Sequence, residues 1–139
     1  MATYTDKISY TQSNQFFTAK SKTFVSPNDG SYAVFSFPRY TLVSQVFVLI
    51  TTAYAGGTPV LSVGWSGNTE TAVADGFLSN DIFDPTATGL KLSTKDTLTS
   101  NQGKYFNLGS GLLTLTVAAG GATTEGTFVI LANYSNVFM

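Results

Sequence analysis

Hydrophobic and polar residues alternate along most of the chain, in short runs separated by glycine, proline, asparagine and aspartate. Alternation with a period of two residues is typical of a β-strand that has one face in a core and the other in solvent. No stretch keeps its apolar residues at the spacing of an amphipathic helix for three turns. The pattern therefore predicts an all-β domain built from strands and turns.

Five runs carry the clearest strand pattern, and three more are shorter. The clear runs are residues 32–37, 41–52, 60–65, 112–118 and 127–134, and the others are 71–74, 89–93 and 104–108, with a loop-rich stretch at 75–88. The second clear run is apolar on both faces in its later half, which predicts a central strand covered on both sides. The last two clear runs are separated by a turn through Gly120 and Gly121, which predicts that they pair as a hairpin.

Seven to eight strands without intervening helices favour an antiparallel two-sheet sandwich of the jelly-roll or Greek-key type. At 139 residues the chain is long enough to form a single domain with its own core. The residues predicted to be mostly buried lie on the apolar faces of the alternating runs. They are Val43, Phe47, Leu49, Leu61, Val63, Leu113, Leu115, Val117, Phe128 and Ile130.

The first thirty residues have a different pattern, because they are polar with interspersed aromatic side chains and end in a Pro-Asn-Asp-Gly turn. We expect residues 1–30 to form an N-terminal arm or the first strands, and residues 31–139 to form the β-sandwich domain. Deletion of residues 1–25 is then expected to leave the sandwich folded. Four aromatic residues near the termini are predicted to dock onto a neighbouring subunit or to cover the ends of the sandwich: Phe16, Phe17, Phe24 and Phe138.

Charged residues make up 11% of the chain, well below the roughly 25% of average soluble domains. The exposed faces must therefore be largely uncharged and polar. Threonine-rich outer sheet faces explain this, and so does a surface partly covered in an assembly, where unpaired charge would be costly. The net charge is −1 and the seven basic residues are scattered, so no nucleic acid partner is expected.

The chain has no cysteine, which excludes disulfides and thiolate metal sites. Its longest mainly apolar run, residues 42–55, is interrupted by polar residues and is short for a membrane-spanning helix of about 20 residues. The N-terminal sequence lacks the apolar centre of a signal peptide. We expect synthesis in the cytoplasm of the producing cell and no membrane partner.

The absence of histidine removes the commonest general base and the commonest zinc ligand. Three carboxylates, Asp75, Asp81 and Asp84, lie within ten residues of each other. A glycosidase would need two acids beside a groove, and calcium would need several oxygens from one loop, although the spacing is not that of an EF-hand. Turn formation also accounts for Asp81 and Asp84. We expect no enzymatic activity, cofactor or metal.

Trp65, the single tryptophan, ends an alternating strand, which places it in the core or at the core edge. An exposed tryptophan could instead anchor a ligand or a partner. A carbohydrate-binding module would require Trp65, Tyr32, Tyr54 and Tyr105 to line one exposed platform.

Two stretches, PVLSVGWSGNTETAVADGF and GKYFNLGSGLLTLTVAAGGATTEGTFVILANYS, resemble a pattern found in small virion proteins of tailed bacteriophages. In those proteins a strand ending in Val-Gly precedes a polar loop and an Asp-containing segment, and the last strand ends in a tyrosine such as Tyr134. The resemblance covers residues 58–135, and no catalytic residue is carried over. It implies a β-sandwich that decorates a capsid or forms part of a fibre or tail.

The resemblance implies a virion structural protein, specifically a capsid decoration or cement protein on the surface of a phage head. Such a protein would assemble as a homotrimer and contact the major capsid protein, with residues 1–30 against the shell or the adjacent protomer. The alternatives are a phage fibre or tail adaptor component and a carbohydrate-binding β-sandwich module.

Overall fold

A computed structural model describes residues 17–56, 59–67, 69–78, 86–92, 103–118 and 125–137. These residues form ten strands and no helix, which confirms the all-β prediction. The strands are β1 (Phe17–Lys20), β2 (Phe24–Val25), β3 (Gly30–Phe37), β4 (Thr41–Ala55), β5 (Val60–Gly67), β6 (Val73–Leu78), β7 (Gly89–Leu92), β8 (Lys104–Phe106), β9 (Gly111–Ala118) and β10 (Glu125–Asn136).

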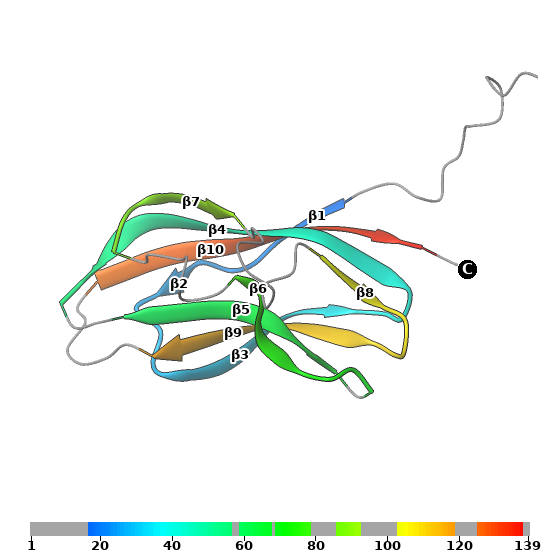
Figure 1. The fold of residues 1–139 in the computed structure, drawn as a ribbon. Coiled ribbons are helices and arrows are strands. Elements are labelled where there is room, and N and C mark those ends of the chain that lie inside the picture. The colour runs from blue at the N-terminus through cyan, green and yellow to red at the C-terminus, as the bar shows by residue number, and fades with distance from the viewer. Residues whose placement is uncertain are drawn as a thin grey trace, which may run out of the picture.

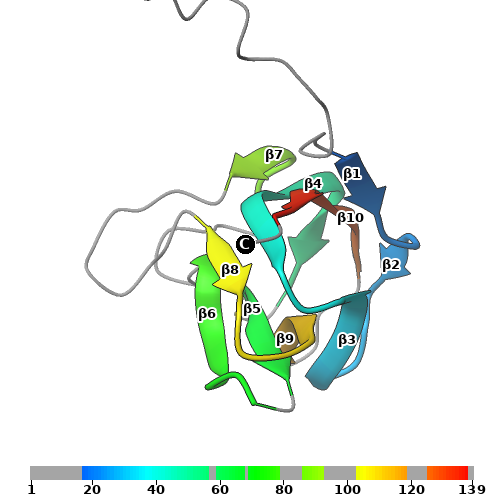
Figure 2. The same cartoon turned by 90° about the vertical axis from the view of Figure 1, so that its right-hand side faces the viewer.

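The strands form two antiparallel sheets that face each other (Figures 1 and 2). Sheet A contains β1, β2, β10, β4, β7 and β8, and sheet B has the order β3-β9-β5-β6. Strands β1 and β2 pair with successive parts of β10, and β7 and β8 pair with successive parts of β4. Strands β1 and β2 together therefore act as one interrupted edge strand of sheet A, and β7 and β8 together act as the other. Counted in this way, each sheet has four strands. The predicted two-sheet sandwich is confirmed.

The core lies between the sheets and draws large apolar side chains from both. The largest fully buried side chains are Phe77, Phe106, Phe128, Ile50, Leu61, Leu78, Leu113, Leu115, Ile130, Val43, Val46 and Val48. Eight of the ten predicted core residues are buried as expected, and the exceptions are Phe47 and Leu49. The period-two alternation in β5, β9 and β10 thus identified the inward faces correctly.

Phe47 and Leu49 are only half-buried, because the inward face of β4 changes along the strand. A register shift in the pairing with β10 makes Ser44 an extra residue. An extra residue of this kind turns all following side chains to the opposite face of the sheet. Inward positions are therefore odd-numbered up to Val43 and even-numbered from Val46 onward. Strand β4 is central in sheet A, as predicted, but its outer face is not fully covered.

The predicted hairpin between the last two strands is wrong. Strand β9 lies in sheet B between β3 and β5, whereas β10 lies in sheet A beside β4. Residues 119–124, which include Gly120 and Gly121 and lie outside the described residues, therefore connect the two sheets. A glycine turn between two strands does not determine whether those strands enter the same sheet.

Strand β6 extends through Asp75 and Gly76, which the sequence pattern placed in a loop. Gly76 makes this possible because the ring of Trp65 occupies the space beside it, and an added Cβ would lie 2.1 Å from that ring. The ring of Phe77 then packs edge-on against Trp65 with centroids 5.0 Å apart.

The segment from Phe17 to Val25 belongs to the sandwich. Strands β1 and β2 both pair with β10, and Phe24 stacks on Phe128 with ring centroids 5.2 Å apart. Deletion of residues 1–25 would remove a core ring and expose the edge of β10, so the expectation that this deletion spares the fold is corrected. A truncation that spares the described strands ends at residue 16.

Leu115→Ala should lower the free energy of unfolding by about 2–5 kcal/mol, because it empties a fully enclosed site between the sheets. Leu112→Ala on the same strand, at a half-buried outward position, should cost less than about 1.5 kcal/mol. Chemical denaturation of both variants measures the difference. Equal losses would show that the inward face of β9 is assigned incorrectly.

Candidate functional site

The three aspartates considered for chemistry do not form a site among the described residues. Asp75 is half-buried on β6, and Asp81 and Asp84 lie outside the described residues. In the described part of the chain, no three His, Cys, Asp or Glu side chains are grouped to hold a metal ion, and no helix there has the length and apolarity to cross a membrane. That the protein has no enzymatic activity stays a prediction.

The aromatic platform required of a glycan-binding module is not formed by the four predicted residues. Trp65 and Tyr54 are only 5% and 4% exposed and belong to the core, which confirms the core position predicted for Trp65. The indole Nε1 of Trp65 donates a hydrogen bond to the carbonyl of Thr71 at 3.0 Å. The hydroxyls of Tyr32 and Tyr105 both donate to backbone carbonyls.

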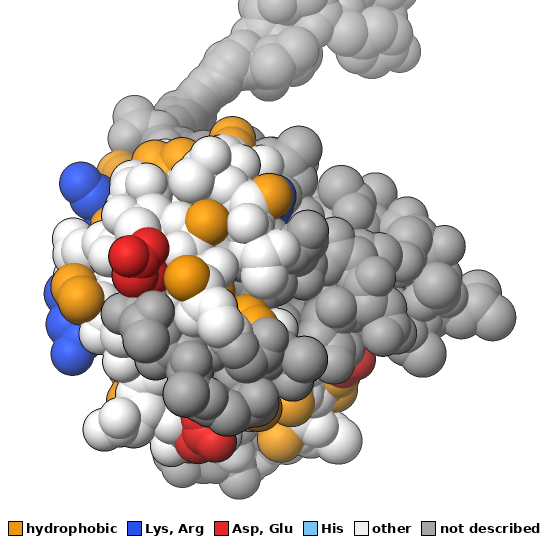
Figure 3. Space-filling view, turned by 90° about the vertical axis from the view of Figure 1, so that its left-hand side faces the viewer, with side chains coloured by type: hydrophobic (Ala, Val, Ile, Leu, Met, Phe, Trp, Pro, Cys, Tyr) orange, Lys and Arg blue, Asp and Glu red, His pale blue; other side chains and the backbone are white. Residues whose placement is uncertain are grey.

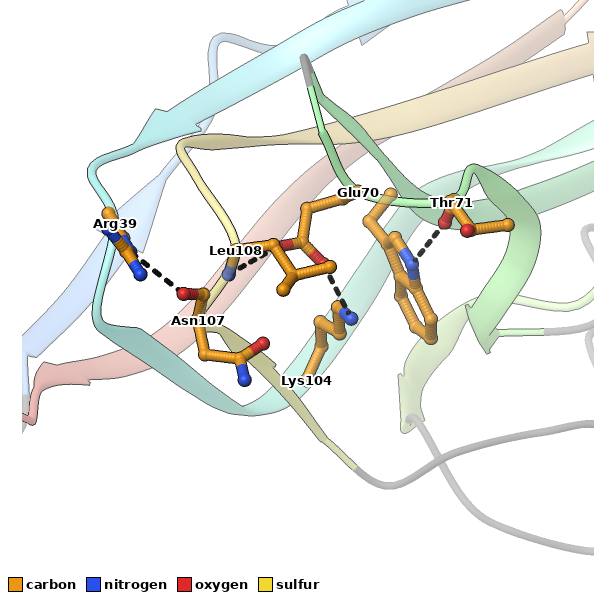
Figure 4. Close-up of polar contacts among 7 residues, drawn as sticks. Arg39, Glu70, Thr71, Lys104, Asn107 and Leu108 are labelled. Carbon is orange, nitrogen blue, oxygen red and sulfur yellow. Dashed lines mark hydrogen bonds and ion pairs between the residues drawn. The ribbon is translucent and has the colours of Figure 1, made fainter.

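A polar cluster lies at one end of the sandwich, where the turn between β3 and β4 meets the segments before β6 and after β8 (Figure 4). At its centre is Glu70, whose side chain is 1% exposed. One carboxylate oxygen lies 2.8 Å from the Lys104 ammonium, and the other accepts a hydrogen bond from the Leu108 N–H at 3.0 Å. The buried charge is thus compensated by an ion pair and by the backbone.

These contacts determine the ionisation of Glu70. Burial alone would raise the pKa of its carboxyl, but the hydrogen bond and charge of Lys104 and the backbone N–H groups of Leu108 and Gly109 together hold that pKa below its ordinary value. Glu70 is therefore a carboxylate at neutral pH, and it fixes the turn that follows β8.

The same turn is held from a second side by Arg39. The Arg39 Nε donates to the carbonyl of Asn107 at 2.8 Å, and the guanidinium lies 4.6 Å from the ring centroid of Tyr40. Tyr40 has a φ of 71°, a left-handed conformation that costs a non-glycine residue on the order of 1–3 kcal/mol. Chemically, this cluster holds loops in place, and it presents Leu108, 58% exposed, at the surface.

No sequence feature pointed to this cluster. Glu70 is a single acid in a threonine-rich segment, and its partner Lys104 is 34 positions away along the chain. The sequence indicated a different candidate site, the four aromatic residues near the termini.

The four aromatic residues predicted to make contacts are placed differently from one another. Phe24 is buried in the core. Phe17 is 46% exposed on β1, and its ring lies 5.7 Å from that of Tyr134. Phe16 and Phe138 lie outside the described residues. Of the two that are described, Phe17 therefore offers apolar surface to a partner.

Beside β1 lies a hollow of about 300 Å³, formed where β1 and β10 of sheet A approach β3 of sheet B. We call it the aromatic hollow, and it is lined by Ala19, Phe35, Ser36, Phe37, Pro38, Tyr134 and Asn136. The ring of Phe37 lies 5.2 Å from that of Tyr134 and 6.0 Å from that of Phe35. The lining is aromatic with two polar side chains and carries no charge.

The strands that border the aromatic hollow are at the edges of their sheets. Among the described residues, nothing pairs with the outer edges of β3 or of β1. Strand β3 has eight residues and contains neither proline nor a charged side chain. Natural sheets use proline and charged side chains to protect an exposed edge from pairing with another chain. The side of the sandwich that carries the hollow is therefore suited to accept an additional strand.

The end of the sandwich opposite the polar cluster has a different surface. Figure 3 shows hydrophobic side chains that are mostly scattered singly among uncharged polar atoms, with few acids or bases. Single exposed apolar side chains are ordinary on a protein surface. A second hollow of about 290 Å³, lined by residues 22–28 and Tyr32, differs from the aromatic hollow because its lining includes the charged Lys22.

No family model matches the chain, and no curated protein matches it in sequence. Chains of solved structures match in fold, among them two from phage capsids. A chain from the acidic stable capsid structure of Helicobacter pylori bacteriophage KHP30 is 20% identical, with a TM-score of 0.61 and 86% of each chain covered. A chain from the cyanophage Pam1 capsid asymmetric unit is 12% identical, with a TM-score of 0.68, covering 99% of this chain and 98% of that one. At these identities the likeness shows a shared fold.

Glu70→Gln should lower the free energy of unfolding at pH 7 by roughly 2–3 kcal/mol. This is less than the ~3–5 kcal/mol for breaking a fully buried pair, because the Lys104 side chain remains 23% exposed. Glu125 is exposed, so Glu125→Gln is the matched control. It should change the free energy of unfolding by less than about 0.5 kcal/mol. Thermal or urea unfolding measures both.

The pH dependence of the same variant tests the ionisation of Glu70. Its pKa is lower in the folded chain than in the unfolded chain, so the unfolded state binds protons first as the pH falls below the ordinary pKa of a glutamate side chain. Wild-type stability due to this group should be lost from that pH downward to the folded-state pKa. Glu70→Gln should show a shallower loss, and parallel curves would contradict the assignment.

Proposed function

We propose that this chain is a structural protein of a bacteriophage virion, specifically a decoration or cement protein that binds the assembled shell of the head. The observation that carries the proposal is the order of the strands. We count β1 with β2 as one strand and β7 with β8 as one strand. In chain order, the eight strands then belong to sheets A, B, A, B, B, A, B and A. We infer that this is the jelly-roll order, an architecture that viral capsid domains share with lectins and cupins.

A shared architecture does not decide between these functions. A lectin role is disfavoured because Trp65 and Tyr54 are in the core, and a cupin-like metal site has no ligand cluster among the described residues. Two structures that match in fold are both from phage capsids. The Pam1 chain is covered almost completely, so a chain of about this length occurs in a phage capsid.

The physical properties of the chain suit a protein that is added to an assembled shell. The two sheets of one chain enclose a core of buried apolar side chains, which a protein that folds before it is added to a shell requires. With 11% charged residues, its surface can be covered by neighbours without leaving many ions unpaired. Stabilisation of the shell would come from surface buried across capsid subunits.

We extend the proposal to the assembly: a homotrimer on the capsid surface that contacts the major capsid protein, with residues 1–16 and Phe17 against the shell or the adjacent protomer. Three copies linked in one trimer would multiply modest individual contacts through their effective concentration. A fibre or tail location is the alternative that the experiment below distinguishes.

Purified full-length protein, mixed with undecorated shells of the phage that encodes it, should bind saturably and raise the temperature at which the shells rupture. Cosedimentation and a thermal release assay measure the two effects. Because few charges are involved, the affinity should change little between low and high salt. An unrelated sandwich protein of similar size serves as the control for nonspecific association.

Mass spectrometry of purified particles gives an independent test. The chain should be present in the particles in a copy number that scales with the shell. Absence from particles would contradict the virion assignment. Recovery only with isolated tails or fibres would contradict the decoration role while leaving the virion assignment intact.

A further inference from the structure

We propose that the aromatic hollow and the free edge of β3 form a docking site for the N-terminal segment, residues 1–16, of a neighbouring copy of the same chain. The segment would add to the edge of β3 as an extra strand and place alternate side chains in the hollow. This inference rests on the proposed trimer and names the contact that would hold it together.

The site offers both elements that strand addition needs. The outer edge of β3 supplies unpaired backbone N–H and C=O groups within the described residues, and such groups provide much of the affinity in strand addition. The adjoining hollow of about 300 Å³ supplies an aromatic lining from Phe35, Phe37 and Tyr134. Pockets beside an edge strand select the side chains of the strand that is added.

The sequence of the N-terminal segment matches this site. Ile8 and Tyr10 alternate with Ser9 and Thr11, so an extended segment would present the two apolar side chains on one face. Residues 8–16 carry no charge, and neither does the lining of the hollow. Docking of residues 8–16 would therefore bury no unpaired ion.

The length of the segment and the place where it joins the sandwich favour a neighbouring copy. It enters at Phe17, at the border of the hollow, and seven extended residues from there to Tyr10 span about 23 Å. Residues 11–16 contain neither glycine nor proline, the strongest signals for reversing the chain. An extended path outward is therefore favoured over a return to the segment's own hollow.

Symmetry also favours this occupant over direct pairing of two β3 edges. Two identical edges that pair with each other form a two-fold contact and stop at a dimer. A segment that binds a different surface on its neighbour forms a head-to-tail contact, and such contacts can close into a ring of three.

The experiment uses full-length variants in pairs. The double variant Ile8→Asp and Tyr10→Asp, called the segment variant, places two charges on the apolar face of the segment and should prevent docking. Its control is the double variant Ser9→Asp and Thr11→Asp, which places the same charges on the opposite face. Ser36→Trp fills the hollow from an exposed position on β3, and Ser31→Trp is the control at an exposed position of the same strand that does not line the hollow. Thermal unfolding first confirms that every variant is folded.

Native mass spectrometry and sedimentation should show trimers for the wild type and both controls, and monomers for the segment and hollow variants. When those two monomers are mixed, the intact segment of the hollow variant can bind in the intact hollow of the segment variant. Only this one contact can form, so the mixture should yield a 1:1 dimer. Synthetic peptide 1–16 should bind the segment variant saturably and bind the Ser36→Trp form of that variant at least tenfold more weakly.

Trimers that persist in the segment variant, or a mixture that stays monomeric, would overturn the inference. A wild type that is monomeric, with a hollow that accepts its own segment, would overturn it as well. These outcomes are separate from the shell experiment. If the chain binds shells but its segment does not dock in a neighbouring copy, only this inference is contradicted. If the segment docks in a neighbouring copy but the chain does not bind shells, only the proposed function is contradicted.

Discussion

The antiparallel pairing of β4 with β10 is the contact on which the rest of the structure depends. The two strands come from opposite halves of the chain and are paired from Thr41 and Asn136 to Ala55 and Glu125. Their inner faces supply one side of the core, which β5 and β9 cover from sheet B. The interrupted edge strands attach only to this pair, β1 and β2 to β10, and β7 and β8 to β4. Loss of the central pairing would therefore remove sheet A as a whole.

The sequence pattern was informative where a structural effect is local and uninformative where it depends on distant residues. Alternation located the strands and most of the core, since burial of one face acts on successive residues of one strand. The extra residue at Ser44 has no local signal, because a bulge is defined against the partner strand. The connection after β9 looked like a hairpin, since turn residues do not specify a sheet. The role of Glu70 depends on Lys104, which only the tertiary fold brings near.

The polar cluster and the side with the aromatic hollow serve different purposes in the proposed assembly. The polar cluster around Glu70 satisfies its own charges and gives the loops at one end a fixed shape. The side with β1 and β3 keeps free edges and an uncharged aromatic hollow among the described residues. A protein that must fold alone and then be covered by neighbours needs both properties. The low charge of the chain is consistent with this, because covered charges would require partners.

Electron cryomicroscopy of phage particles that contain the chain would test the proposed decoration role most directly. Density for the two-sheet sandwich is expected on the outer surface of the shell, in clusters of three that touch the major capsid protein. Density for the sandwich on the tail or fibres, or shells that lack it entirely, would show that the chain is not a decoration protein.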